Sequence, residues 1–186
     1  MSSIEHLMTV ADLEKYSDDE WNRYELIEGE LFVSTAPGIP HQLVLLNLQV
    51  ALANYLTRNP IGRIVPGPGA VFSNFDAVIP DLVFVRNERW SEIISNNRFN
   101  AAPDLVIEIL SPGSENRKRD LSAKRRLYGK YGVAEYWIVD PEIQSLAIYG
   151  LTLNALEEMA TFTNEEEIVS PLLPELHLNV TSLFVF

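Results

Sequence analysis

The first clear pattern of hydrophobic and polar positions along the chain is an alternation that is typical of β-strands. From Tyr24 to Val33 the alternation is interrupted near Glu28-Gly29, which predicts a β-hairpin with its turn there. From His41 to about Arg58 apolar residues recur at positions 45, 48, 52, 55 and 56, which is helical spacing. Pro40 suits the first turn of that helix, and Asn59-Pro60 ends it.

Short apolar runs rich in β-branched residues indicate strands farther along the chain. Asp81 to Val85 and Leu105 to Leu110 are apolar enough to be buried strands. Other strands are expected around the turn at residues 66–69, over 133–139, over 145–149 and in the last 35 residues, which end in an extended tail. Residues 10–20 are typical of a short helix and its entry.

A second long helix is expected between two of these strands. Ser114 suits an N-cap, Glu115 suits the first turn, and the helix should run to about Tyr131 and end at Gly132. The order of elements predicts an α+β or mixed α/β class built around one sheet. The length predicts one domain over residues 1–186, with an N-terminal extension at 1–20 and C-terminal strands and tail at 150–186.

Composition narrows the class of protein. Cysteine is absent, so disulfides, thiolate metal sites and a cysteine nucleophile are excluded. The N-terminus has neither a basic region nor an apolar core of a signal peptide. The longest mostly apolar run, Leu43 to Leu56, is shorter than the roughly 18 residues of a membrane span. We therefore expect a soluble, cytoplasmic protein without a membrane partner.

Charge is distributed unevenly along the chain. Fourteen basic and 26 acidic residues give a net charge of −12, which argues against a general nucleic-acid coat protein. Half of the basic residues nevertheless fall between positions 117 and 130: Arg117, Lys118, Arg119, Lys124, Arg125, Arg126 and Lys130. This segment is either a solvated helix face or a local patch that binds anions.

Glu108 is the most informative polar residue. It stands in a strand whose two faces are both apolar, so its side chain should be at least partly buried. A buried carboxylate needs a proton, a partner or a metal ion. The alternatives are a plain buried salt bridge or an edge strand with Glu108 in water.

Asp81 and Lys124 are the residues that could join Glu108. Each of the two buried strands follows a Pro-Asp pair, and if the strands are neighbours Asp81 and Glu108 converge at a site suited to Mg²⁺. The alternative for Asp81 is a turn-capping role. Lys124 lies in the inward stripe of its helix with Leu121 and Tyr128, so it needs a carboxylate partner. An i,i+4 pair with Asp120 is the alternative.

Other chemistries have little support. The three histidines are far apart, so a histidine-rich zinc site is not expected, and His41 is more typical of a capping or packing residue than of a catalyst. Nucleophile-elbow, dinucleotide-binding and phosphate-loop motifs are absent.

Several motifs in order resemble the Uma-type putative restriction endonuclease family of the PD-(D/E)xK nuclease superfamily, a family abundant in cyanobacteria. The resemblance covers about residues 20–185. It rests on YELIEGE at 24–30, His41, Pro80-Asp81-Leu82, PDLVIEILSP at 103–112, Asp120, Lys124, Tyr128, GVAEYWIVDP at 132–141 and SPLLP at 170–174.

The resemblance implies a restriction-endonuclease-like core, a mixed sheet flanked by helices, with the N-terminal hairpin appended. It places metal-binding acids at Asp81 and Glu108. Our own hypothesis adds the backbone carbonyl of Ile109 as a further metal ligand. The superfamily lysine should follow Glu108 by two residues, where this chain has Leu110. Lys124 is the candidate replacement, as the superfamily tolerates a lysine on the next helix. The same resemblance implies a further acid at Glu25 or Glu28, and we prefer Glu25.

The sequence as a whole therefore predicts a metal-dependent endonuclease that uses Mg²⁺ or Mn²⁺ on nucleic acid, with DNA as the expected substrate. Asp81, Glu108, Lys124 and Glu25 are the predicted catalytic residues. Residues predicted to contact the nucleic-acid backbone are Arg117, Lys118, Arg119, Arg125 and Arg126. One alternative is an inactive nuclease-like fold that binds nucleic acid or protein, and another is a homodimeric scaffold. A homodimer is compatible with any of these readings.

Overall fold

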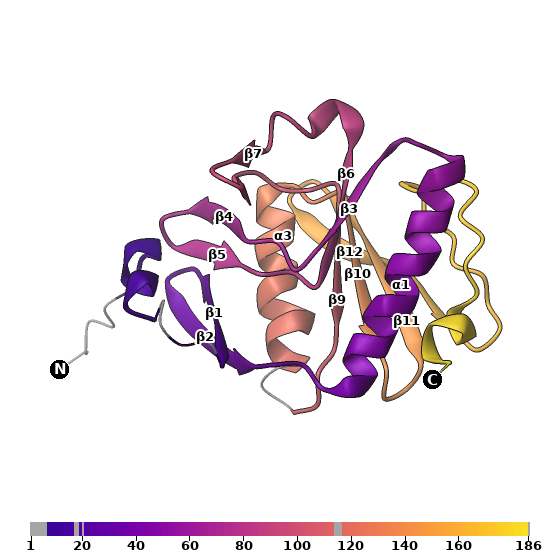
Figure 1. Cartoon of the computed structure of the whole chain (residues 1–186), viewed down its shortest axis with the longest axis horizontal. Coiled ribbons are helices and arrows are strands. Elements are labelled where there is room, and N and C mark those ends of the chain that lie inside the picture. Colours follow the sequence, from indigo (N-terminus) through magenta and orange to yellow (C-terminus); the bar gives the residue numbers. More distant parts are fainter. Residues whose placement is uncertain (1–6, 17–18, 20, 114–116, 186) are drawn as a thin grey trace.

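The computed structural model describes residues 7–16, 19, 21–113 and 117–185 of the chain (Figure 1). Its strands form two six-stranded sheets, each with parallel and antiparallel neighbours. The predicted α+β class, with a mixed sheet flanked by helices and an N-terminal hairpin, is confirmed. The strands divide between two sheets where one was expected, because the Pro66-Gly67-Pro68-Gly69 turn sends the strands on its two sides into different sheets.

The first sheet, here called the central sheet, has the strand order β12-β11-β10-β9-β6-β3. Only β9 and β10 run parallel, and the long connection between them carries a helix, as a parallel crossover requires. The strand bounds are β3 Gly62–Pro66, β6 Leu82–Arg86, β9 Leu105–Ile109, β10 Glu135–Asp140, β11 Ser145–Thr152 and β12 Ala155–Thr163.

The second sheet, here called the hairpin sheet, has the order β2-β1-β5-β4-β8-β7. Its hairpin turns through Glu28 and Gly29, whose φ values of 54° and 80° are those of the two-residue turns that match strand twist. The predicted hairpin is thus confirmed. The strand bounds are β1 Asn22–Ile27, β2 Glu30–Thr35, β4 Ala70–Ser73, β5 Asp76–Val78, β7 Ile94–Ser95 and β8 Arg98–Phe99.

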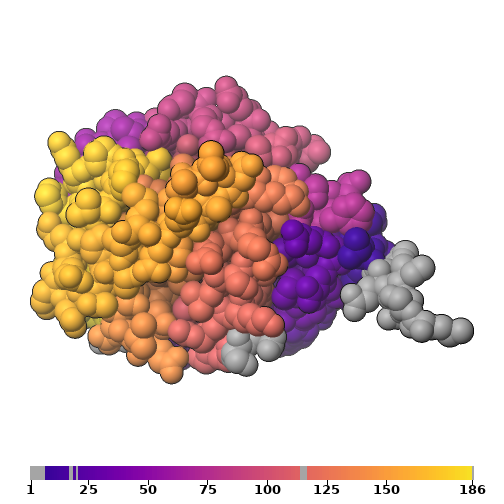
Figure 2. Space-filling view, turned by 180° about the vertical axis from the view of Figure 1, so that it is seen from behind, coloured from indigo at the N-terminus to yellow at the C-terminus, as the bar shows by residue number. Residues whose placement is uncertain are grey.

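Helix α1, Ile39–Arg58, covers one face of the central sheet, as Figure 1 shows. Its buried residues Val44, Leu48 and Leu52 belong to one core cluster with Ile107 of β9 and Leu183 of the C-terminal segment. That segment includes the 3₁₀ helix η4, Val180–Phe184. In the space-filling view the yellow C-terminal segment lies at one end of the molecule, opposite the indigo and purple hairpin region (Figure 2).

The opposite face of the central sheet packs against the second helical segment. This begins with a π-helical stretch, η3 Arg119–Lys124, and continues as α3 Arg125–Tyr131, which ends at Gly132 with φ of 84°. The predicted end of this helix is confirmed, whereas the predicted cap at Ser114 and Glu115 lies outside the described residues. Val106 of β9 and Leu110, which directly follows this strand, lie in the same core cluster as Leu127.

The remaining helical elements are short. They are the 3₁₀ helices η1 Val10–Tyr16 and η2 Asn87–Arg89. Within the described part of the chain, no helix is both long enough and apolar enough to cross a membrane.

Candidate active site

A pocket of about 190 Å³ opens where the two sheets meet η3 and the start of α1. Charged side chains reach it from β1, from the residue just before β6, from the end of β9 and from η3. Its charged and titratable lining residues are Arg23, Glu25, His41, Asp81, Glu108, Arg119, Asp120 and Lys124. Residues distant in sequence therefore share one small polar pocket.

Glu108 reaches the pocket because β9 alternates its side chains between two faces. Leu105, Ile107 and Ile109 pack toward α1, so Glu108 points toward the helical segment η3–α3. The side chain is only 3% exposed. One carboxylate oxygen, Oε1, accepts hydrogen bonds from Lys124 Nζ at 2.9 Å and from Tyr128 Oη at 2.7 Å. The expected burial of Glu108 is confirmed, and β9 is central, not an edge strand.

Lys124 lies at the centre of the buried charges. Its Nζ is 2.9 Å from Glu108 Oε1, 3.0 Å from Glu25 Oε1 and 3.7 Å from Asp120 Oδ1. Burial would lower the pKa of Lys124, but the carboxylates of Glu108, Glu25 and Asp120 together raise it above its usual value. The lysine is therefore a permanent cation, and it bridges three elements in addition to making the i,i+4 pair with Asp120.

The carboxyl group of Glu108 is in the opposite situation. Burial raises the pKa of Glu108 to about 8; Lys124 opposes this shift, while Asp81, Asp120 and Glu25 add to it. The attraction of Lys124 is thus smaller than the combined effect of burial and of repulsion by the neighbouring carboxylates. Near neutral pH Glu108 holds a proton that a bound cation would displace.

Asp81 comes immediately before β6, and β6 pairs antiparallel with β9, so the condition for Asp81 and Glu108 to converge is met. Its Oδ2 accepts a hydrogen bond from the amide of Ile109 at 2.9 Å and lies 3.0 Å from His41 Nε2. Burial would raise the pKa of Asp81, but the contacts with His41, the Ile109 amide and Lys124 lower it. Asp81 is therefore the ionised carboxylate of the pair.

The two candidate glutamates of the hairpin have different environments. Glu25, on β1, is buried; it accepts a hydrogen bond from the amide of Ile79 and forms an ion pair with Lys124 at 3.0 Å. Glu28 is at the hairpin turn, with a side chain 57% exposed, and lies 3.9 Å from Arg126. The structure brings Glu25 into the pocket and leaves Glu28 outside it.

The predicted backbone-contacting residues are spread over several environments. Arg119 is turned into the pocket, where it lies 3.0 Å from Asp120 and 3.7 Å from Glu25. Arg117 pairs with Asp140 at 2.6 Å, and the guanidinium of Arg125 lies over the ring of Tyr149. Lys118 and Arg126 are exposed.

The donor set suits a hard divalent cation that is bound by few protein ligands. Asp81 and Glu108 each have one oxygen held by hydrogen bonds, while Asp81 Oδ1 and Glu108 Oε2 have no hydrogen bond from the described residues. Both residues line the pocket. In the described part of the chain no three acidic or histidine side chains are arranged as a metal cage. Mg²⁺ commonly uses one or two carboxylates and keeps several waters, so two carboxylates and the carbonyl of Ile109 fit it.

Sequence reasoning missed several residues of this pocket. Arg23 was not considered, Asp120 and Arg119 were assigned other roles, and His41 was interpreted as a packing residue. His41 Nδ1 is the one fully enclosed side-chain polar atom without a hydrogen-bond partner in the described part of the chain. The spacing of Arg23 and Glu25, two residues apart on one strand, is the only local signal for Arg23.

Comparisons with known proteins identify the family of the chain and a similar fold. A family model described as Uma2, putative restriction endonuclease, matches residues 10–181. The fold is similar to the crystal structure of a putative nuclease belonging to DUF820 from Anabaena variabilis ATCC 29413. The two share 24% identity with a TM-score of 0.75, over 95% of this chain and 97% of the other. No curated protein matches the chain.

Proposed function

The chain belongs to the Uma2 putative restriction endonuclease family, and we propose that it is a divalent-cation-dependent nuclease that hydrolyses phosphodiester bonds of DNA. The observation that carries the proposal is the meeting of Asp81, Glu108 and Lys124 in one pocket. Family membership and a nuclease-like fold supply the reaction class, and the pocket supplies the groups that such a reaction needs.

The main objection to nuclease activity is the absence of the expected lysine two residues after Glu108, and the position of Lys124 supports activity in spite of it. Leu110 occupies the place of the expected lysine and is buried in the apolar cluster between the sheet and α3. Lys124 comes from η3 instead, and its Nζ reaches Glu108 at 2.9 Å. A cation beside the acidic pair is therefore retained, although its position in the sequence differs.

Asp81, Glu108 and the carbonyl of Ile109 are the residues that would hold Mg²⁺ or Mn²⁺. When bound there, the cation would polarise a phosphoryl oxygen and lower the pKa of a water molecule. The pocket prepares for it in two ways. Asp81 is held in place by His41 and the Ile109 amide, and Glu108 would release its proton when the divalent cation binds.

Lys124 stabilises negative charge that develops at the phosphate. It keeps its proton because three carboxylates surround it, and it is held in place before substrate arrives. The net reaction adds one water across a P–O ester bond. It leaves a phosphate monoester, a free hydroxyl group and one released proton.

Exposed cations outside the pocket are proposed to hold the nucleic-acid backbone. Lys118 and Arg126 are exposed on the helical segment that supplies Lys124. Such contacts position a duplex but do not read its sequence. Arg117 and Arg125 would first have to leave Asp140 and Tyr149, so they contribute less.

A second candidate function is a nuclease-like module that binds without cleaving. It is favoured by Leu110 in the lysine position and by the net charge of −12. In that case Glu108 and Lys124 would be a buried ion pair alone. Homodimer formation is compatible with both functions and remains a prediction.

Cleavage of plasmid DNA, single-stranded DNA and RNA with Mg²⁺ or Mn²⁺ tests the proposal. Glu108→Gln keeps the shape of the side chain and should abolish cation-dependent cleavage. Arg58→Gln is the matched control, because Arg58 is exposed at the far end of α1, roughly 25 Å along the helix from His41. Cleavage that survives in Glu108→Gln, or that needs no divalent cation, would contradict the proposal.

A further inference from the structure

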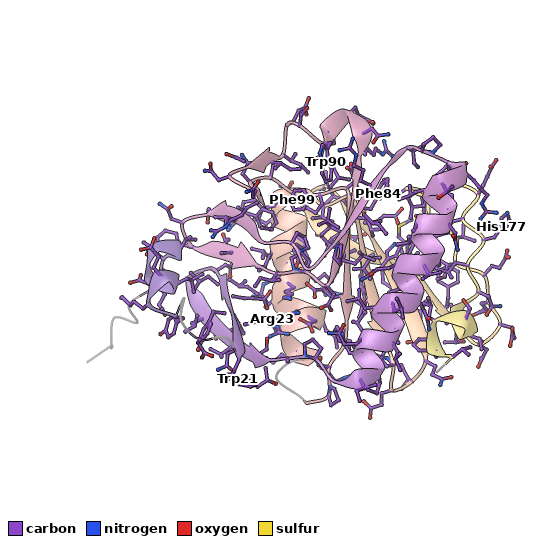
Figure 3. All side chains as sticks on the ribbon, in the orientation of Figure 1. Trp21, Arg23, Phe84, Trp90, Phe99 and His177 are labelled. Atoms are coloured by element: carbon purple, nitrogen blue, oxygen red, sulfur yellow. The ribbon has the colours of Figure 1, made fainter. Side chains whose placement is uncertain are left out.

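Arg23 differs from the other cations of the pocket. Its side chain is 37% exposed, whereas those of Arg119 and Lys124 are 10% and 2% exposed. It lies on β1 two residues before Glu25, so both side chains project from the same face of the strand. Figure 3 shows Arg23 between the hairpin and the helical segment, while the neighbouring Trp21 lies at the edge of the molecule.

Arg23 is held more weakly than the buried cations. Its ion pair in the described structure is with Asp81 Oδ1, at 3.7 Å. Lys124, by comparison, contacts three carboxylates, and two of these contacts are 3.0 Å or shorter. A long, partly exposed ion pair contributes little stability, so Arg23 can change partner at low cost.

The partner of Arg23 is also the oxygen that the proposed cation needs. Asp81 Oδ2 is occupied by His41 and the Ile109 amide, which leaves Oδ1 for either Arg23 or a metal ion. The pocket lining carries four carboxylates and three cationic side chains. Addition of a divalent cation therefore leaves positive charge in excess, and the guanidinium released from Asp81 is available to an anion at the pocket mouth.

We propose that Arg23 binds a phosphate group of the nucleic-acid backbone and exchanges Asp81 for that phosphate when a divalent cation enters the pocket. The planar guanidinium suits bidentate contact with phosphate oxygens. This proposal rests on the proposed function, because it takes the nucleic-acid backbone as the ligand. It assigns Arg23 two effects of opposite sign: competition with the cation and attraction of the substrate.

The test measures the two affinities separately in Arg23→Gln, Arg23→Lys, Arg58→Gln and the wild type. Calorimetric titration with Mn²⁺ alone should show Arg23→Gln binding about threefold more tightly than the wild type, since the competing charge is gone. Fluorescence anisotropy of a labelled 20-base-pair duplex, with Ca²⁺ present and duplex integrity checked on a gel, should show about tenfold weaker binding. The salt dependence of duplex affinity should also be weaker in Arg23→Gln than in the wild type, by the amount that corresponds to about one phosphate contact.

The control variants sharpen the interpretation. Arg23→Lys keeps the charge, so both affinities should stay within about threefold of the wild type, and Arg58→Gln should change neither. Weaker Mn²⁺ binding in Arg23→Gln would overturn the proposal, because it would show that Arg23 supports Asp81 structurally. Unchanged duplex binding would also overturn it. A wild type that binds Mn²⁺ but neither binds nor cleaves nucleic acid would instead remove the proposed function, and the proposal with it.

Discussion

Two buried glutamates lie at opposite ends of the parallel pair β9–β10. Glu135 begins β10, and its carboxylate accepts hydrogen bonds from Trp137 Nε1, the Ser170 hydroxyl and the Leu172 amide, so both oxygens are used. Glu108, near the end of β9, has only Oε1 held, and it borders a pocket. Exposure is 4% for Glu135 and 3% for Glu108, so burial does not separate them.

The difference lies in how the hydrogen bonds are completed. Glu135 fastens the C-terminal segment to the central sheet through neutral donors, which is a structural role. Glu108 keeps one oxygen without a hydrogen bond from the described residues, and it lies among other carboxylates. An incompletely satisfied acid beside a pocket marks a binding site more reliably than burial does.

The largest effect is expected from removing the cation of the Glu108 cluster. Lys124→Met leaves Glu25, Glu108 and Asp120 buried without it, and should lower the free energy of unfolding by about 3–5 kcal/mol. Chemical denaturation at pH 7 measures this loss. The double variant Lys124→Met/Glu25→Gln should recover part of it, because it removes one of the buried carboxylates that Lys124 contacts, and a double variant no more stable than Lys124→Met would contradict the proposed coupling.

Neutralising Glu108 should separate catalysis from stability. Glu108→Gln should reduce cation-dependent cleavage by on the order of a thousandfold, because it removes a ligand of the proposed metal ion. At pH 7 the variant should be at least as stable as the wild type, since glutamine resembles the protonated Glu108 of the folded state, and the wild type must keep a proton that its unfolded chain has lost. Cleavage assays and thermal denaturation on the same preparation measure both. A large loss of stability at pH 7 would make Glu108 a structural residue like Glu135.

Neutralising Glu135 should give the reverse result. Glu135→Gln replaces an acceptor oxygen by a donor beside Ser170 or the Leu172 amide, at a cost of about 1–3 kcal/mol. Mn²⁺ affinity should remain within about twofold of the wild type. Urea denaturation and calorimetry check the two expectations. Loss of Mn²⁺ binding in a folded Glu135→Gln would contradict a purely structural role for Glu135.

The remaining expected effect is a pH dependence that belongs to Glu108. Its pKa of about 8 in the folded protein exceeds the usual value of 4.5, so the folded state keeps a proton that the unfolded chain has lost. The free energy of unfolding should therefore fall as pH rises from about 4.5 to 8, by at most about 1.4 kcal/mol per pH unit from this group. The lowered pKa of Asp81 affects the free energy of unfolding at lower pH, and the raised pKa of Lys124 affects it at higher pH, so neither overlaps with the effect of Glu108.

Denaturation with EDTA present at pH 6 and pH 8, in wild type and Glu108→Gln, isolates the contribution of Glu108 to the pH dependence of stability. The facing groups, Lys124, Tyr128, Asp81, Asp120 and Glu25, are the same in both proteins. The wild type should lose more stability than the variant between the two pH values. Equal losses would mean that Glu108 is ionised throughout this range.

Local sequence patterns were enough to predict much of the fold and part of the pocket. Alternation along β9 identified Glu108, and helical spacing placed Lys124 on the buried side. The π-helical turn was not predictable, because apolar spacing was read with an α-helical period, and it brings Arg119 into the pocket beside Asp120. Such turns are frequent at functional sites. The contact of His41 with Asp81 depends on how α1 packs, which no local pattern encodes.

The central claim is that Asp81 and Glu108 form one cation site, and calorimetric titration of Mn²⁺ tests it without knowledge of the substrate. The account predicts that the wild type binds one Mn²⁺, that Asp81→Asn and Glu108→Gln each weaken binding by on the order of a hundredfold, and that Glu135→Gln does not. Binding should also release protons below pH 8, as cation replaces the proton of Glu108. A wild type that fails to bind, or variants that bind as tightly as the wild type, would contradict the account.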